Sequence, residues 1–208
     1  FIKNMKLGKV VNISEMRPAL HTALRATHNL SERTFQSNFG SQIDTELKRI
    51  CILSNKIRNG LWDGSDIKKI TDVISLGIGG SHLGAELVVD ALSQNTNAAP
   101  KLHFIANPGN IEIKNKLKNL NAETTLIIII SKTFSTLETI SNAQVFYQWL
   151  KIKLGEQKAS RHLIAVTSSK SKALKFGVNT ENIFNIWEWV GGRFSLWSSA
   201  GIPIALAL

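Results

Sequence analysis

The run Leu126–Ile130 reads LIIII, a series of large apolar residues with no polar alternation. Such a strand is buried on both faces, as at the centre of a parallel sheet covered by helices. Shorter β-rich runs lie before and after it, and helical or turn-rich stretches separate them. The expected strands are 72–76, 102–106, 125–131, 162–167 and 183–187. This alternation predicts an α/β fold with a doubly wound, mainly parallel five-stranded sheet.

The N-terminal part of the chain has a different pattern of apolar residues. Residues 12–29 and 43–57 carry apolar side chains at helical spacing, and Asn12 or Ser14 can cap the first of these helices. We therefore expect an N-terminal helical segment over 1–65, followed by a sheet domain over 66–208 that is cut at its C-terminal end.

Both ends of the sequence support this expectation of a fragment. The chain opens at Phe1 without a methionine and closes on the apolar run ALAL, with no residue that would stop a helix. We expect exposed apolar surface around 201–208, where a missing part would pack.

Composition narrows the functional classes. The 25 Lys and Arg against 15 Asp and Glu give a formal charge of +10, which favours an anionic partner. The basic residues are scattered and form no nucleic-acid motif, so only the charge supports a nucleic-acid-binding domain. The single cysteine, Cys51, excludes an internal disulfide framework, and the apolar runs are too short to span a membrane. We expect a cytoplasmic protein without nucleic-acid or membrane partners.

The stretch LGIGGSHLGAEL at 76–87 has the form of a phosphate loop. It lies between an expected strand and helix, and Ser81 is placed to cap that helix. The glycine spacing fits neither the dinucleotide fingerprint nor a P-loop, so a nucleotide is not indicated. The alternative is a tight turn that needs glycine only for its backbone angles.

The stretch SKTFSTLETISNA follows the central strand and is rich in side-chain donors. Four hydroxyls, one ammonium and the free amides of a helix start suit a dianionic phosphate monoester. The alternative is an ordinary Ser or Thr cap beside an incidental lysine. The donors are Ser131, Lys132, Thr133, Ser135 and Thr136.

The stretch WEWVGGRFSLWS at 187–198 places a permanent positive charge after two glycines. We expect Arg193 to begin a helix that runs to the end of the chain and to hold negative charge there. The alternative is that Arg193 pairs with Glu188. The tryptophans of this stretch are expected in the core or at an interface.

These three stretches, with NISEMRPALHTALR near the N-terminus, resemble the signature motifs of the glucose-6-phosphate isomerase family. The resemblance implies a sugar-isomerase (SIS), flavodoxin-like fold in a homodimeric enzyme. Such an enzyme interconverts glucose 6-phosphate and fructose 6-phosphate through an enediolate, without a metal or organic cofactor.

The resemblance also implies roles for individual residues. Arg193 matches the arginine that stabilises the enediolate and is the one catalytic residue expected here. The 6-phosphate would be gripped by Ser131, Lys132, Thr133 and Thr136. The other substrate-binding residues would be Gly80, Ser81 and Gly192.

The chain departs from the family pattern at four positions. His82 and Glu188 stand where aspartate is usual, Leu137 replaces a glutamine, and Ser135 replaces a threonine. His82 and Leu137 flank the expected site.

The family's base and ring-opening groups come from motifs that 1–208 lacks. The expected N-terminal helix carries His21 and His28, for which a core or surface role is expected. We therefore assign no catalytic base and expect the fragment alone to be inactive. The alternative function is a stand-alone regulatory module that binds a sugar phosphate.

Overall fold

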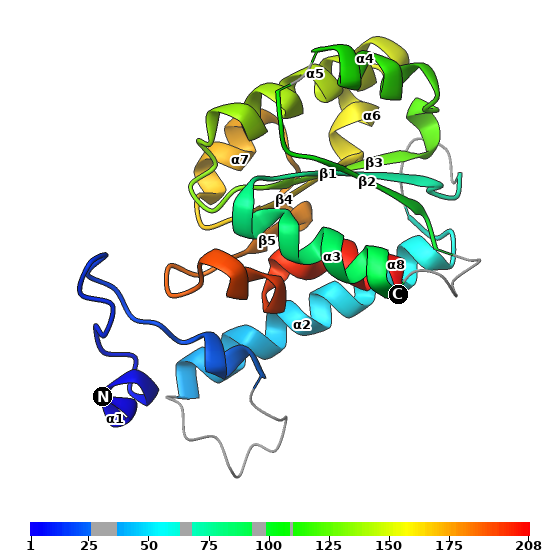
Figure 1. The fold of residues 1–208 in the computed structure, drawn as a ribbon. Helices are drawn as coiled ribbons and strands as arrows, with labels where there is room; N and C mark the ends of the chain where they lie inside the picture. Colours follow the sequence, from blue (N-terminus) through cyan, green and yellow to red (C-terminus); the bar gives the residue numbers. More distant parts are fainter. Residues whose placement is uncertain (26–36, 63–67, 93–98, 109) are drawn as a thin grey trace.

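The computed structural model describes residues 1–25, 37–62, 68–92, 99–108 and 110–208. At its centre is a parallel five-stranded sheet with the order β2-β1-β3-β4-β5 (Figure 1). The predicted α/β class, the parallel sheet and all five strands are confirmed. The strands are β1 (Asp72–Leu76), β2 (Lys101–Ile105), β3 (Thr125–Ile130), β4 (Leu163–Thr167) and β5 (Ile183–Asn185).

The apolar run occupies β3, the middle strand, in which every residue is buried. Its side chains alternate between two hydrophobic clusters, as they must in a pleated strand. On one face, Ile128 packs with α2 (Ser37–Arg58), α8 (Ile202–Ala207) and residues 187–190, which include two tryptophans. On the other face, Ile127 and Ile129 pack with α5 (Leu137–Leu154). The sheet is therefore covered on both faces, as the sequence predicts.

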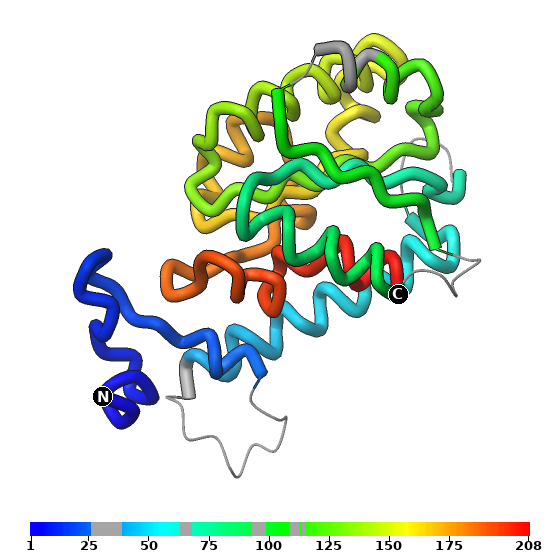
Figure 2. Tube along the Cα trace, in the orientation of Figure 1, coloured from blue at the N-terminus to red at the C-terminus, as the bar shows by residue number. Residues whose placement is uncertain are grey.

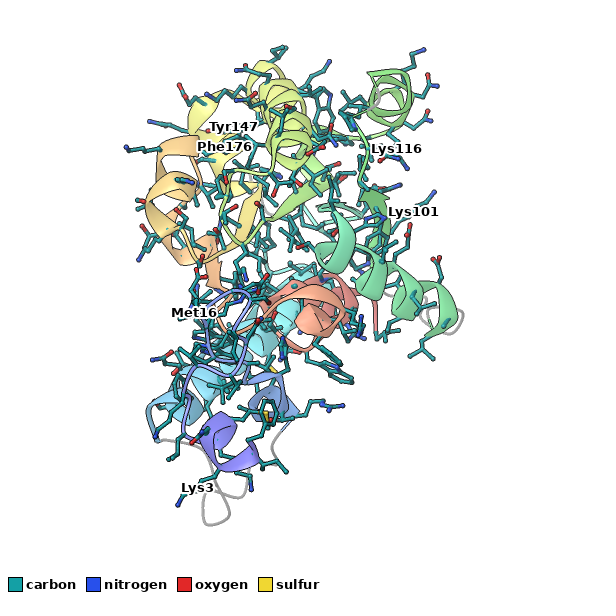
Figure 3. The ribbon with its side chains drawn as sticks, turned by 60° about the vertical axis from the view of Figure 1, so that its left-hand side comes forward. Lys3, Met16, Lys101, Lys116, Tyr147 and Phe176 are labelled. Atoms are coloured by element: carbon teal, nitrogen blue, oxygen red, sulfur yellow. The ribbon has the colours of Figure 1, made fainter. Side chains whose placement is uncertain are left out.

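Helices form a layer on each side of the sheet. In Figure 1, α4 to α7 cover one face, and α2, α3 and α8 cover the other. Figure 3 shows Tyr147 of α5 beside Phe176 of α7, and the two rings stack with centroids 5.6 Å apart. The α-helices are α1 (Ile2–Lys6), α2 (Ser37–Arg58), α3 (Leu83–Leu92), α4 (Asn110–Lys118), α5 (Leu137–Leu154), α6 (Glu156–Arg161), α7 (Lys170–Phe176) and α8 (Ile202–Ala207).

The predicted helix over 12–29 is wrong where the structure describes it. Asn12 and Arg17 form an isolated antiparallel bridge, and a short 3-10 helix, η1 (His21–Arg25), follows. Proline disfavours a helical conformation in the residue before it, here Arg17, and Met16 has a left-handed φ of 49°. Residues 26–29 lie outside the described residues.

The second predicted N-terminal helix, 43–57, is confirmed within the longer α2. Leu20, Ile43 and Ile57 share one cluster with buried residues of the sheet. The N-terminal segment, blue in Figure 2, approaches the orange segment that follows β5. The division of the chain near residue 65 stays a prediction.

The C-terminal part differs from its prediction in two ways. Instead of one helix from Arg193 onwards, the chain forms η7 (Gly192–Trp197), η8 (Ser199–Gly201) and α8. The expected exposed apolar surface is also wrong, because Ile202, Pro203 and Leu206 are buried. α8 packs against α2 and α3, which shield its apolar side chains from water.

Candidate functional site

The two stretches that the sequence predicts to bind phosphate follow neighbouring strands at the switch point of the sheet. β1 has β2 on one side and β3 on the other, and Leu76 pairs with Ile129 across the parallel ladder. Loops that leave neighbouring strands in opposite directions open a crevice at their carboxyl ends, where α/β proteins bind ligands. The glycine turn after β1 and the loop 131–136 after β3 flank this crevice.

The glycine turn forms a 3-10 helix, η3 (Gly79–Ser81), before α3 begins at Leu83. Gly79 has a φ of 58°, and a Cβ on Gly77 would lie 2.6 Å from the Ser81 carbonyl oxygen. The predicted helix cap is therefore wrong, because Ser81 belongs to the turn itself. Within the described part of the chain, no hydrogen bond engages the Ser81 hydroxyl, so it is available to a ligand.

Gly80 brings this turn against the loop that carries Arg193. A Cβ added to Gly80 would lie 2.2 Å from the carbonyl oxygen of Gly192, so no larger residue fits without moving the backbone. The predicted substrate-binding residues Gly80, Ser81 and Gly192 are thus brought together, although the first and last are 112 positions apart by their numbers.

The hydroxyl-rich loop after β3 is a tight turn. The Phe134 amide donates to the Ser131 carbonyl at 3.0 Å, and Phe134 is buried with a left-handed φ of 48°. Ser131 is also buried, and its hydroxyl lies 3.1 Å from that of Thr136. Thr133 and Ser135 are exposed. Of the predicted hydroxyl donors, Thr133 is therefore the more accessible and Ser131 braces the turn.

The first turn of α5 leaves its amides available. Thr136 is the residue that precedes α5, and its side chain makes no capping hydrogen bond. Helix-start amides without a capping partner attract anions, because they combine free N–H groups with the positive end of the helix dipole. This geometry supports an anion site rather than the alternative of an ordinary Ser or Thr cap.

The end of β4 and the residues that follow it fix the backbone of the loop 131–136. The Lys132 carbonyl accepts from the Ser168 amide at 2.9 Å, the Ser168 hydroxyl at 2.8 Å and the Thr167 hydroxyl at 2.9 Å. Lys172 of α7 donates to the Thr133 carbonyl at 3.0 Å. These contacts hold residues 132 and 133 from the side of β4.

The Lys132 side chain extends from the loop 131–136, called here the hydroxyl loop, to the segment 187–198 that carries Arg193, called the arginine loop. Its ammonium donates to the Val190 carbonyl at 2.9 Å. Partial burial and the nearby Arg17 charge lower the pKa of Lys132. The structure thus shows this lysine joining two loops.

The backbone before Arg193 is held by the N-terminal segment. The Arg17 guanidinium donates to the Glu188 carbonyl at 3.1 Å, and the Gly191 amide donates to Nε2 of His21 at 3.1 Å. Arg17 and His21 also line a cavity of about 280 Å³ beside Gly191 and Gly192. The sequence predicts a core or surface role for His21 and no role for Arg17, although both belong to the NISEMRPALHTALR motif.

Arg193 itself is exposed in η7. Among the residues that the structure describes, its guanidinium forms no ion pair, so the alternative of a pair with Glu188 is not realised. Its guanidinium carbon lies 5.5 Å from the centre of the Phe194 ring. A permanent positive charge is thus available to an anionic ligand.

The tryptophans of the arginine loop serve mainly in packing. Trp187 and Trp189 are buried and stack with ring centroids 4.8 Å apart, and Trp187 donates to the Gln42 side chain at 2.9 Å. Their burial confirms the prediction of a core or interface position for these two tryptophans. Trp197 is 47% exposed and lies beneath the Arg25 guanidinium.

The two departures beside the site have different environments. His82 is buried, its Nε2 lies 3.1 Å from a Glu86 carboxylate oxygen, and its ring meets Phe104 edge-on. Leu137 is 77% exposed at the start of α5. His82 is therefore engaged in packing between α3 and β2, whereas Leu137 leaves an apolar side chain beside the hydroxyl loop.

The ranges that the structure describes contain no group of three or more His, Cys, Asp or Glu side chains able to hold a metal ion. None of the helices in these ranges combines the length and apolar character needed to cross a membrane.

Comparison with known proteins gives a consistent result. The sequence model described as phosphoglucose isomerase matches residues 1–208. The chain is 48% identical over 202 residues to a glucose-6-phosphate isomerase of Stutzerimonas stutzeri, covering 97% of this chain and 36% of that protein. It is 46% identical over 208 residues to one from Pseudomonas putida (strain GB-1), covering all of this chain and 38% of that protein.

A solved structure agrees with these matches. The crystal structure of a glucose-6-phosphate isomerase from Chlamydia trachomatis superposes with a TM-score of 0.75 at 26% identity, covering 98% of this chain and 38% of that one. The chain therefore spans little more than a third of the length of these relatives.

Proposed function

The chain belongs to the phosphoglucose isomerase family, and we propose that it supplies the phosphate- and sugar-binding loops of a glucose-6-phosphate isomerase. The reaction is the interconversion of glucose 6-phosphate and fructose 6-phosphate by proton transfer through an enediolate. The observation that carries the proposal is the approach of three loops: Gly80 of the glycine turn lies against Gly192 of the arginine loop, and Lys132 of the hydroxyl loop donates to Val190 of that same arginine loop.

The phosphate of the substrate is assigned to the start of α5. Thr133 and Thr136 supply hydroxyls, and the first amides of the helix supply further donors to a dianion. Ser131 contributes by holding Thr136, because their hydroxyls are 3.1 Å apart. Lys132 contributes its positive field and its link to Val190.

The sugar and the reacting carbons are assigned to the opposite side of the crevice. Gly80, Ser81 and Gly192 line the sugar, where glycine lets backbone groups come close to the substrate. Arg193 stabilises the negative charge that develops on the enediolate. Positioned charge of this kind acts most strongly where water is excluded.

Aldose–ketose isomerisation also needs a base that moves a proton between C1 and C2. Glu138 and Glu188 lie within the matched motifs but take structural positions in the family pattern, so we assign no base within 1–208. We propose that the base and the ring-opening groups belong to the remaining length seen in the relatives, that the whole enzyme is a cytoplasmic homodimer, and that residues 1–208 alone show no turnover.

The test is steady-state kinetics on the full-length protein that carries this chain. Thr133→Ala removes one donor to a charged phosphate, a loss of about 1.5–3 kcal/mol or roughly 10- to 150-fold in affinity. Ground and transition states share that contact, so KM rises while kcat changes less. Arg193→Ala removes a contact to developing charge, so kcat falls by roughly 100-fold or more while KM stays closer to normal.

Thr45→Ala, at an exposed position on α2, is the matched control and leaves both constants unchanged. The role assignments are reversed if Arg193→Ala raises only KM and Thr133→Ala lowers only kcat. A full-length protein that binds 6-phosphogluconate but shows no turnover would instead identify a sugar-phosphate-binding regulatory module.

A further inference from the structure

His21 touches the arginine loop on both sides of Arg193. Its Nε2 accepts a hydrogen bond from the Gly191 amide at 3.1 Å. Its ring also lies against the Phe194 ring, with centroids 5.2 Å apart and planes tilted by 49°. Gly191 and Phe194 flank the pair Gly192-Arg193, so the His21 side chain contacts the loop both before and after Arg193.

Two further side-chain hydrogen bonds reach this loop, and both hold backbone that precedes Arg193. Lys132 donates to the Val190 carbonyl, and Arg17 donates to the Glu188 carbonyl. On the other side of Arg193, His21 contacts the Phe194 ring. The Arg193 guanidinium carbon lies 5.5 Å from the centre of that same ring. His21 is therefore placed to fix the direction of the Arg193 side chain as well as the path of the backbone.

The protonation state of His21 suits this task. Nε2 accepts from an N–H group, so the ring is neutral with its proton on Nδ1, because a protonated imidazole has no acceptor. Burial and the positive charges of Arg17 and Lys132 lower the pKa of His21, which keeps the acceptor available near neutral pH.

We propose that His21 is a positioning residue for Arg193, which it holds through the Gly191 amide and the Phe194 ring. The proposal rests on the proposed function, in which Arg193 meets charge on the enediolate. Because a misplacement of about 1 Å can lower a rate roughly 100-fold, loss of the two His21 contacts is expected to lower kcat.

The test compares two variants of the full-length enzyme. His21→Leu keeps bulk but removes the acceptor, and we expect kcat to fall by roughly 10- to 100-fold with little change in KM. His21→Gln offers an amide oxygen near the position of Nε2 and should restore most of the lost kcat. His103→Leu is the matched control, since the His103 Nε2 lies 2.8 Å from a carboxylate oxygen of Asp72 where β1 and β2 pair, and it leaves kcat unchanged.

A second measurement is independent of activity. Hydrogen–deuterium exchange on the peptide that contains Gly191 should be faster in His21→Leu than in the wild type, and close to the wild-type rate in His21→Gln. Wild-type kcat and exchange in His21→Leu would overturn the proposal, as would an equal kcat loss in both variants. If the full-length wild type has no isomerase activity, the proposed function fails, and the exchange rates alone decide whether His21 holds the loop.

Discussion

The guanidinium carbon of Arg49 lies 4.4 Å from the centre of the Phe184 ring, which joins α2 to the edge strand β5. The same guanidinium donates to the carbonyls of Glu181 at 2.9 Å and Ile183 at 2.8 Å, and it pairs with the Glu46 carboxylate at 2.8 Å. Glu46 also accepts from the Asn185 amide at 3.3 Å. One planar fork thus ties the N-terminal helix to the strand that leads into the arginine loop.

Arg49→Lys is expected to lower the free energy of unfolding by about 1–3 kcal/mol, because an ammonium cannot reproduce several directed donors or the flat stacking of a guanidinium. Arg58→Lys, at the last residue of the same helix, is the matched control and should change stability by less than about 0.5 kcal/mol. Urea denaturation of the chain measures both. Equal stability of the two variants would show that the fork contributes nothing.

Gly80→Ala is expected to displace the arginine loop, because the added methyl group would meet the Gly192 carbonyl oxygen at 2.2 Å. Overpacking of this kind typically costs about 1–3 kcal/mol, and the full-length enzyme should also lose kcat. Gly79→Asn tests the neighbouring position, where the φ of 58° suits asparagine and no atom lies within 4 Å of an added Cβ. Thermal unfolding and kinetics should therefore separate the two variants, and a tolerated Gly80→Ala would contradict the close approach.

Lys132→Met is expected to lower kcat as well as raise KM. Its ammonium donates to Val190, three residues before Arg193, so its loss frees the arginine loop and also weakens the positive field around the proposed phosphate site. Lys170→Met, at the exposed start of α7, is the matched control for charge alone. A change confined to KM, equal to that of the control, would mean that Lys132 acts only through its charge.

The buried His162 predicts a loss of stability in acid. Its Nδ1 donates to the Thr125 carbonyl at 2.8 Å, and burial lowers the pKa of His162. The unfolded chain therefore takes up a proton before the folded chain does. The stabilisation is complete above the unfolded pKa of about 6.5 and is lost as the pH falls below it, with a slope of up to about 1.4 kcal/mol per pH unit.

His162→Asn keeps a donor near the position of Nδ1 and removes the titration, so its stability should fall less steeply below pH 6.5. His21 has a lowered pKa and contributes with the same sign, which makes the double variant with His21→Gln the flattest of the series. Urea denaturation between about pH 5 and 8 measures these slopes. An unchanged slope in His162→Asn would assign the acid loss to other groups.

The strands were predictable because their residues have one strong local signal. LIIII has no helical periodicity or polar alternation, and each of the other runs is short and bounded by turn residues. The helix at 12–29 was predicted from a real apolar periodicity, but Pro18 and the left-handed Met16 favour a turn there. Local propensity competes with tertiary contacts in such a segment, and here residues 17–21 are used to hold a distant loop.

The site was predictable in its loops but not in its contacts. The motifs correctly place Gly80 and Gly192 in one region, yet nothing in the sequence says that the two backbones touch. The Lys132 ammonium and the His21 imidazole find partners 58 and 170 positions away. Such pairings depend on how the loops are brought together by the sheet, which periodicity and spacing do not encode.

The three donors on the Lys132 carbonyl have a consequence for the energetics of ligand capture. Ordering one backbone residue costs about 1–2 kcal/mol of conformational entropy, and a floppy loop would lose that amount from its affinity for each residue it ordered. Here β4 and its following turn have already immobilised the peptide between Lys132 and Thr133 during folding. The loop is therefore preorganised, and the dianion that we propose for it would meet backbone whose conformational entropy was already lost when the sheet formed.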